Sequence, residues 1–295
     1  MKKNEKSAID FEKVEDEIVK KEAVTQISIN TELLTPISIF FGAIIISLSI
    51  FFSFRGLNVP VNNNVAKTPE TTTEVQQQAQ APDNPTVSID KVKSLFNGGG
   101  ISFGNENSKL LFVEFSDPSC PYCHIAGGKN PELNKQVGKQ FTLKADGGTY
   151  VAPVPEMKKL VDEGKASFVW IYTNGHGNGE LATESLYCAK EKGKFWEAHD
   201  LLMSNSGYSI INDTVKNDRS KSPELAKFLS SVVDSSFMQG CLEGKKYNAK
   251  IAENQNLARS MGVSGTPGFF VNETNFAGAY SFTDMQSVVS EALSK

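Results

Sequence analysis

The chain has 295 residues, so its length is compatible with one domain plus added segments or with two domains. Its hydrophobic content of 39% and charged content of 22% are ordinary for a globular protein. A net charge of −4 provides no basic surface, which argues against nucleic acid as a partner. Four cysteines are too few for a disulfide-rich scaffold, but they suffice for one redox-active pair and one structural pair.

The first 86 residues divide into three segments of different composition. Residues 1–35 are polar and densely charged, which predicts a disordered tail. Residues 36–54 carry no charge and have nearly the length that an α-helix needs to cross a bilayer, so we interpret them as a membrane anchor. Residues 55–86 are rich in Asn, Thr, Gln and Pro and predict a flexible linker.

A buried core helix and a cleaved signal peptide are the alternatives for residues 36–54. A core helix is seldom apolar on every face. A signal peptide has a shorter apolar stretch, a basic leader and a cleavage site with small residues. Here the leader is long and acidic, and no Ala-x-Ala site follows. Two basic residues flank the segment on each side, so the positive-inside rule leaves the orientation open.

The remaining residues, 87–295, contain all four cysteines and predict one α/β domain. Short apolar runs predict strands, and apolar residues spaced by three and four predict helices. The predicted strands lie at 109–115 and 167–172, the helices at 180–192, 195–202, 222–232 and 247–261, and a hairpin at 269–280 around Glu273 and Thr274. A last helix follows, with a capping box at 283–286.

Cys120 and Cys123 follow the first predicted strand and enclose Pro121 and Tyr122. A helix that begins here brings free backbone N–H groups and the positive end of the helix dipole to Cys120, which favours a thiolate. Pro121 suits the first turn because its missing N–H is not needed there. Cys123, one turn along, can resolve a mixed disulfide, and His124, when protonated, would stabilise the thiolate further.

Half of a zinc site is the alternative for two cysteines at this spacing. A structural zinc site usually takes four cysteine or histidine ligands. The chain has no second Cys-x-x-Cys and no His-x-x-x-His. We therefore interpret Cys120 and Cys123 as a redox-active dithiol and expect no metal and no cofactor.

Two further features occur at informative positions. Glu114 lies inside the apolar strand before the dithiol, where an unpaired carboxylate is costly to bury; an exposed edge position is the alternative. Pro267 enters a predicted strand, where proline loses a ladder hydrogen bond and so needs a positional reason.

These motifs, in this order, resemble those of the DsbA-like family of the thioredoxin superfamily, from about residue 108 to the C-terminus. The resemblance implies an α/β thioredoxin fold with a helical insertion at about 174–262 and an extracytoplasmic thiol:disulfide oxidoreductase. It also implies that Glu114 assists proton transfer to the resolving thiol and that the bond before Pro267 is cis. By the same resemblance, the residues that contact the substrate are Pro121, Tyr122, Thr266 and Pro267.

The sequence departs from that family in two places. The residues between the cysteines are Pro-Tyr rather than Pro-His, which suggests a less oxidising dithiol. The segment 127–155 makes the connection to the second predicted strand longer than one crossover helix requires, and it predicts an added loop near the active site. Cys188 and Cys241 lie in the insertion, and two buried free cysteines are one interpretation of them. Some members of the family outside the cytoplasm carry a second disulfide in this region, so by the resemblance we expect a structural Cys188–Cys241 bond.

Together these interpretations predict a single-pass membrane protein with a cytoplasmic N-terminus and an extracytoplasmic domain. Reduced exported proteins would be its substrates, and the resemblance implies a quinone-linked membrane oxidase of the DsbB or VKOR type as reoxidant. An outward-facing reductase or isomerase and a non-catalytic binding module or chaperone remain the alternatives. We interpret His176 as a loop residue and His199 as a packed structural residue.

Overall fold

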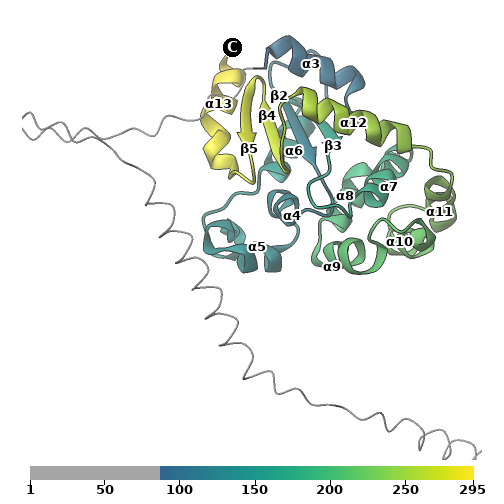
Figure 1. Ribbon diagram of the computed structural model, residues 1–295. Helices are drawn as coiled ribbons and strands as arrows, with labels where there is room; N and C mark the ends of the chain where they lie inside the picture. Colours follow the sequence, from purple (N-terminus) through teal and green to yellow (C-terminus); the bar gives the residue numbers. More distant parts are fainter. Residues whose placement is uncertain (1–86) are drawn as a thin grey trace, which may run out of the picture. The chain divides into compact units, whose positions relative to one another are not determined.

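The computed structural model describes residues 87–295, which are coloured in Figure 1. The predicted tail, membrane anchor and linker, at 1–35, 36–54 and 55–86, lie outside the described residues. Within 87–295, none of the helices has the length and apolar character that a membrane crossing requires.

Five strands of the described part form one sheet in the order β1-β3-β2-β4-β5. They are β1 (Ile101–Phe103), β2 (Leu111–Ser116), β3 (Ser167–Tyr172), β4 (Gly268–Val271) and β5 (Thr274–Ala277). The central strand β2 runs parallel to β3 and antiparallel to β4. All residues of β2 and β3 are buried, which explains their nearly unbroken apolar sequences.

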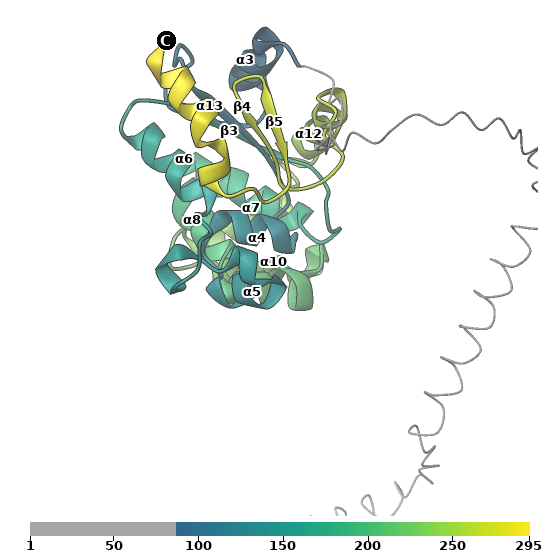
Figure 2. The same ribbon diagram turned by 90° about the vertical axis from the view of Figure 1, so that its left-hand side faces the viewer.

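Helices cover both faces of the sheet, with α3 and α12 on one side of the strands and α6 and α13 on the other (Figure 2). The helices are α3 (Ile89–Gly98), α4 (Pro121–Gly127), α5 (Pro131–Val137), α6 (Pro153–Asp162), α7 (Glu180–Glu191), α8 (Phe195–Leu202), α9 (Asn205–Ser209), α10 (Ser222–Phe228), α11 (Ser235–Glu243), α12 (Asn248–Ser260) and α13 (Phe282–Ser294). Short 3-10 or π-helical stretches are η2 (Lys139–Phe141), η3 (Lys144–Asp146), η4 (Ile210–Val215) and η5 (Arg219–Lys221).

Alternate residues of β2 belong to two different cores. Val113 and Phe115 pack with residues of α3 and α12, whereas Phe112 belongs to the larger core that includes the helical insertion. Glu114 is two residues from Phe112 and therefore lies on the same face, because side chains alternate along a strand. This alternation directs a carboxyl group into the larger core.

The elements agree in type with those predicted, with three differences. The segment 127–155, predicted as a loop, contains α5, η2 and η3 and the start of α6. The strand β1 and the helices α3, α9 and α11 are additional to the ranges predicted. The capping box of α13 lies at Ser281 and Asp284 instead of 283–286, because the Ser281 N–H donates to the Asp284 carboxylate at 3.1 Å.

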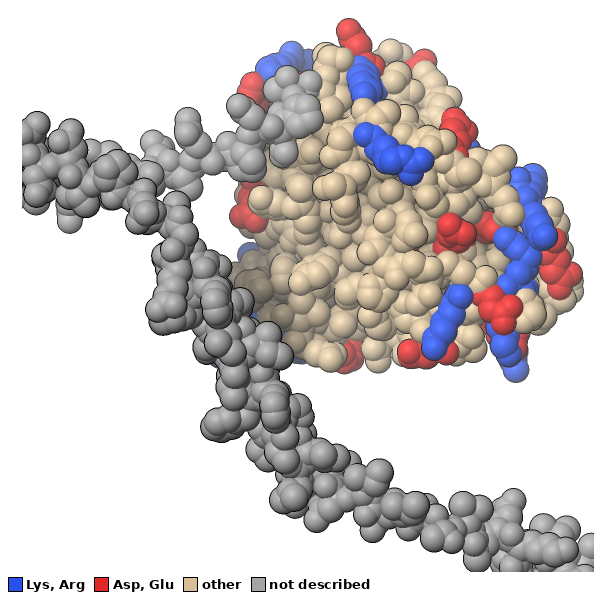
Figure 3. Space-filling model, viewed as in Figure 1, with Lys and Arg blue, Asp and Glu red and all other residues tan. Residues whose placement is uncertain are grey.

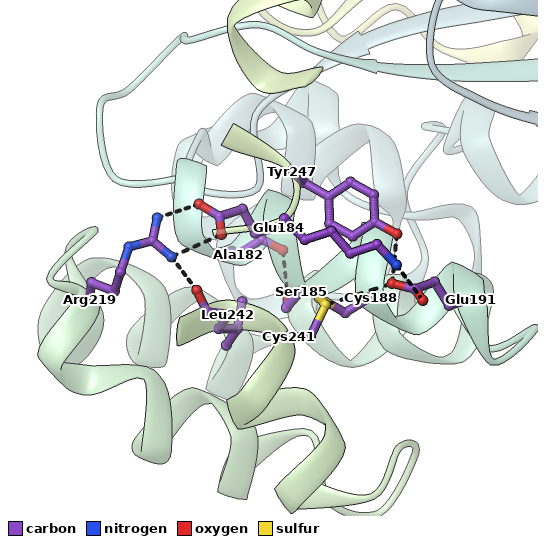
Figure 4. The surroundings of a disulfide bond; sticks show 10 residues. Ala182, Glu184, Ser185, Cys188, Glu191, Arg219, Cys241, Leu242 and Tyr247 are labelled. Carbon is purple, nitrogen blue, oxygen red and sulfur yellow. Dashed lines mark hydrogen bonds and ion pairs between the residues drawn. A yellow bond between two sulfur atoms is a disulfide. The ribbon is translucent and has the colours of Figure 1, made fainter. Parts of the chain in front are cut away.

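Cys188 of α7 and Cys241 of α11 form a disulfide, as expected from the sequence (Figure 4). Near this bond Arg219 donates to the carboxylate of Glu184 at 2.9 Å. The Tyr247 hydroxyl donates to the carboxylate of Glu191 at 2.7 Å. The helices of the insertion are thus joined by one covalent bond and several polar contacts.

Candidate active site

The dithiol lies where β2 leads into α4. Cys120 is the N-cap of α4 and Pro121 occupies its first turn. The carbonyl of Cys120 accepts hydrogen bonds from the N–H groups of Cys123 and His124, at 3.1 and 3.2 Å. One helical turn therefore holds the two thiols together, as the spacing of the motif predicts.

Cys120 has a strongly acidic thiol. Its side chain is only 5% exposed. Hydrogen bonds lower its pKa from 9.0 to about 6, with the Cys123 thiol as the largest contributor and the Thr266 side chain and the Tyr122 N–H also favouring the thiolate, against the opposing effect of burial. At neutral pH, Cys120 is consequently a thiolate.

Cys123 has the opposite character. It is buried, and the Asp117 N–H donates to its sulfur at 3.4 Å. Burial raises its pKa well above 9.0, and negative charge on Cys120 and on Glu114 raises it further. The reduced pair thus carries one thiolate, on Cys120, and one proton, on Cys123.

The acidity of Cys120 has a direct test in its alkylation rate. Because only the thiolate reacts, the rate of iodoacetamide modification of Cys120 should reach half its maximum near pH 6. Cys123→Ser weakens the largest contribution to that shift and should move the midpoint upward. An unperturbed cysteine has a pKa of about 8.5. An alkylation midpoint near that pH in the wild-type protein would contradict the lowered pKa of Cys120.

The loop before β4 faces Cys120 from a distant part of the chain. The Cys120 sulfur lies 3.4 Å from the carbonyl oxygen of Thr266, to which the protonated thiol can donate, and the Thr266–Pro267 peptide bond is cis. Residues 262–268 of this loop line a hollow of about 250 Å³ together with Asn275, Ala277 and Gly278. The dithiol and the proline loop therefore form one continuous site.

Asp117 supports this site and was not singled out from the sequence. It is buried, and its carboxylate accepts hydrogen bonds from the N–H and hydroxyl of Ser119 and from the N–H of Gly175, at 2.8, 2.7 and 2.8 Å. These contacts join the turn before α4 to the loop after β3. The Ser-Asp-Pro-Ser turn is the only local signal for such a role.

Glu114 is 1% exposed, and its negative charge contributes to the raised pKa of Cys123. Burial raises the pKa of Glu114, and the nearby His199 and Ser116 counter part of that shift. Neither of its carboxylate oxygens has a hydrogen-bond partner among residues 87–295. The exposed-edge alternative for Glu114 is therefore wrong, because β2 is covered on both faces.

His124 differs from the sequence expectation. Its ring is buried, and its two nitrogens lie 2.9 and 2.8 Å from the carbonyl oxygens of Met203 and Pro118. Burial outweighs these two contacts and lowers its pKa to about 4. The ring is neutral at neutral pH, so it does not supply the positive charge expected beside the thiolate; it links α4 to the end of α8.

Tyr122 and the segment 127–155 form a wall beside the dithiol. Tyr122 is 44% exposed, and its ring meets that of Phe141 edge to face with 5.9 Å between centroids. Phe141 in turn packs on Tyr150 at 5.7 Å. The added segment thus supplies aromatic surface next to Cys120.

The described residues contain no group of three or more histidine, cysteine, aspartate or glutamate side chains arranged to hold a metal ion. What they contain is a thioredoxin-type sheet, a dithiol at the start of a helix, a cis-proline loop opposite it and a helical insertion. This combination is typical of dithiol proteins with a DsbA-like thioredoxin fold.

Comparisons with known proteins agree with that class. The thioredoxin family model matches residues 154–291, which include Thr266 and Pro267 but not the dithiol. A putative protein-disulfide oxidoreductase of Rickettsia conorii is 24% identical over 248 residues, which cover 80% of this chain and 74% of that protein. A variant of α-DsbA1 from Wolbachia pipientis has a similar fold, with a TM-score of 0.52, 16% identity and coverage of 70% of this chain and 96% of that one.

A Na(+)/H(+) antiporter, NhaA 3, of Salinispora tropica is 26% identical over 192 residues, which cover 64% of this chain. The matched part spans only 24% of the antiporter. Taken with the fold and the site, these findings support a DsbA-like thioredoxin-fold oxidoreductase.

Proposed function

We propose that the protein is a thiol:disulfide oxidoreductase that introduces disulfides into exported proteins from the extracytoplasmic side of a membrane. The difference in acidity between Cys120 and Cys123 carries this proposal. A stable thiolate favours the reduced dithiol, and a dithiol that prefers to be reduced oxidises its substrates.

The reaction uses the two cysteines unequally. A substrate thiolate attacks the sulfur of Cys120 in the oxidised protein, the bond between the cysteines breaks, and Cys123 leaves as a thiolate that takes up a proton. A second substrate thiolate then attacks the substrate sulfur of the mixed disulfide. The substrate disulfide forms and Cys120 leaves as a thiolate, so the two electrons of the substrate remain on the reduced dithiol.

The acidity of Cys120 helps both the rate and the equilibrium of that sequence. A thiol of low pKa leaves a mixed disulfide readily. At pH 7, the pH exceeds the Cys120 pKa of about 6 by one unit. Ionisation of Cys120 therefore stabilises the reduced form by about 1.4 kcal/mol, which raises the reduction potential by about 30 mV. Because the pKa is lowered, this contribution is complete above pH 9 and is lost as the pH falls through about 6.

The surface around the site is compatible with a protein substrate. Backbone carbonyl groups of the cis-proline loop, the exposed Tyr122 and the hollow beside Asn275 can all contact an extended polypeptide. On the face drawn in Figure 3, lysine, arginine, aspartate and glutamate gather toward the edges and are few in the middle.

Location and reoxidation follow from the sequence and belong to the same proposal. The apolar segment 36–54 would anchor the protein with its N-terminus in the cytoplasm, and the linker 55–86 would hold the domain outside. A quinone-linked membrane oxidase of the DsbB or VKOR type would return the dithiol to its disulfide. A thiol reagent that does not cross membranes should modify Cys120 in intact cells, and protection until lysis would contradict this placement.

The reduction potential of the dithiol tests the direction of electron flow. Equilibration with glutathione buffers, followed by alkylation and mass analysis, should give a value closer to about −120 mV, typical of a strong oxidant, than to about −270 mV, typical of a reductase. Cys188→Ala/Cys241→Ala is a suitable control, because its potential should match that of the wild type. A reduction potential near about −270 mV would contradict the oxidase and favour the alternative function, an outward-facing reductase.

A further inference from the structure

Unpartnered polar groups are gathered on the sheet face that carries Glu114. The parallel register of β2 and β3 sets Glu114 opposite Trp170 and Ser116 opposite Tyr172. The buried carboxylate oxygens, the indole N–H and both hydroxyls have no hydrogen-bond partner among residues 87–295. Folded proteins contain few such groups, and a polar interior of this kind suits ordered water.

His199 reaches the same face from α8. Its buried ring stacks on Phe195 with 5.7 Å between centroids, and Phe195 packs on Trp170 at 5.9 Å. Trp170 is the register partner of Glu114. The Nε2 atom of His199 is buried and has no hydrogen-bond partner in the described part of the chain. This nitrogen is therefore available to accept or donate a proton.

The other nitrogen of the same ring contacts a partly exposed carboxylate. The Nδ1 atom of His199 lies 3.4 Å from a carboxylate oxygen of Asp200. Asp200 is 40% exposed and forms an ion pair with Lys129 at 2.6 Å. Both residues line a hollow of about 320 Å³ that Lys158 and Trp196 also border. His199 therefore stands between a buried polar interior and a solvent-accessible carboxylate.

We propose that His199 and Asp200 connect Glu114 to solvent and carry the proton that Cys123 gains and loses during each catalytic cycle. When Cys123 leaves the disulfide, protonated Glu114 gives it a proton. His199 restores the proton of Glu114 from Nε2, through water held by the unpartnered groups, and accepts another at Nδ1 from the side of Asp200. His199 is here a positioning and relay residue, because it acts on the thiols through Glu114.

Reoxidation of the dithiol runs the same steps backwards. His199 first takes the proton of Glu114 at Nε2 and releases the proton on Nδ1 toward Asp200. The Glu114 carboxylate formed in this way then accepts the proton of Cys123, which leaves Glu114 protonated as at the start. One proton enters and one leaves in each cycle, so the imidazole returns to its starting tautomer without turning its ring. This inference rests on the proposed function only for thiol–disulfide exchange at Cys120 and Cys123, and it holds for either direction of electron flow.

Other titratable groups face this route and must be considered in its pH dependence. They are Cys123 and His124 of α4, Tyr150 before α6, Tyr172 of β3, Lys129 after α4 and Asp200 of α8. Burial raises the pKa of both tyrosines and lowers that of His124 to about 4. Although burial opposes it, contacts with His199 and Lys129 lower the pKa of Asp200.

The experiment measures how fast glutathione reduces the oxidised full-length protein between pH 5 and 8, with acid quenching and alkylation. His199→Gln should slow the reaction about 10-fold, at the low end of what a proton-transfer group contributes, and flatten the pH profile. Glu114→Gln should have a similar effect. The double variant should be no slower than either single one, because both residues serve one route.

Three controls separate a relay from a structural role. His176→Gln changes an exposed loop histidine and should keep the wild-type rate and profile. His199→Gln should leave the alkylation midpoint of Cys120 unchanged. If His199→Gln fails to fold, Asp200→Asn keeps the ring in place and should slow the reaction in the same pH range.

NMR titration provides a readout that does not depend on turnover. The chemical shifts of the His199 ring should differ between the wild type and Glu114→Gln, because the substitution removes a carboxyl group that interacts electrostatically with the ring. The relay is overturned if His199→Gln keeps the wild-type profile, or if the slowing in the double variant equals the product of the two single effects. A reductase-like potential of the wild-type protein would refute the oxidase but leave this result intact.

Discussion

Replacement of Cys120 by serine is expected to reduce disulfide exchange to the uncatalysed rate. The hydroxyl of serine does not ionise in the range in which the Cys120 thiolate forms, so the variant lacks the group that a substrate disulfide or thiolate must meet. Both refolding of a reduced protein and reduction of insulin should be lost, because each passes through a mixed disulfide at Cys120.

Cys123→Ser is the matched control for that experiment. It keeps the Cys120 nucleophile but lacks the buried partner thiol, so it should accumulate mixed disulfides that Cys120→Ser does not form. Non-reducing electrophoresis with mass analysis distinguishes the two. If Cys120→Ser assisted refolding as well as the wild type, the protein would be a binding module or chaperone, and the catalytic assignment would fail.

Removal of the structural disulfide is expected to have the largest effect on stability. Cys188 and Cys241 are 53 residues apart, and a cross-link that closes such a loop stabilises a fold by about 4 kcal/mol in the chain-entropy model. Cys188→Ala/Cys241→Ala should lower the free energy of unfolding by about that amount. The ion pair between Arg219 and Glu184 and the contact between Tyr247 and Glu191 remain, so the insertion should still fold at 25 °C.

Urea denaturation followed by circular dichroism measures this difference. The comparison is made in a Cys120→Ser/Cys123→Ser background, in which no free redox thiol can exchange with the structural bond. A change of less than about 1 kcal/mol would show that residual structure in the unfolded chain, or strain in the folded one, offsets the entropic effect of the cross-link.

The elements around the dithiol were predictable because their causes are local. The apolar run at 109–115 is observed as β2 (Leu111–Ser116), and the helix predicted to begin at the dithiol is observed as α4. The spacing of Cys120 and Cys123 sets them one helical turn apart whatever the rest of the fold does. The proline loop was also evident, because a proline at a strand entrance needs a positional reason.

Helices inside 127–155 were missed because their sequences carry weak periodic signals. α5 has seven residues and begins at Pro131 after the N-cap Asn130, whose side chain accepts a hydrogen bond from the Leu133 N–H at 3.2 Å. The side-chain amide of Asn134 donates a hydrogen bond to the Phe141 carbonyl at 3.0 Å, which fixes this short helix against the following segment. Tertiary contacts of this kind override weak propensity.

Local sequence patterns were therefore enough to locate the Cys120–Cys123 pair, the strand and helix that carry it, and the proline loop that faces it. Only the tertiary structure decided the charge state of the site. The partner of the His124 ring, Met203, lies 79 residues away, and Gly175, which binds Asp117, lies 58 residues away. Burial of Glu114 and Cys123 likewise depends on helices from elsewhere in the chain. Because pKa values follow burial and close neighbours, they depend on contacts that no local pattern encodes.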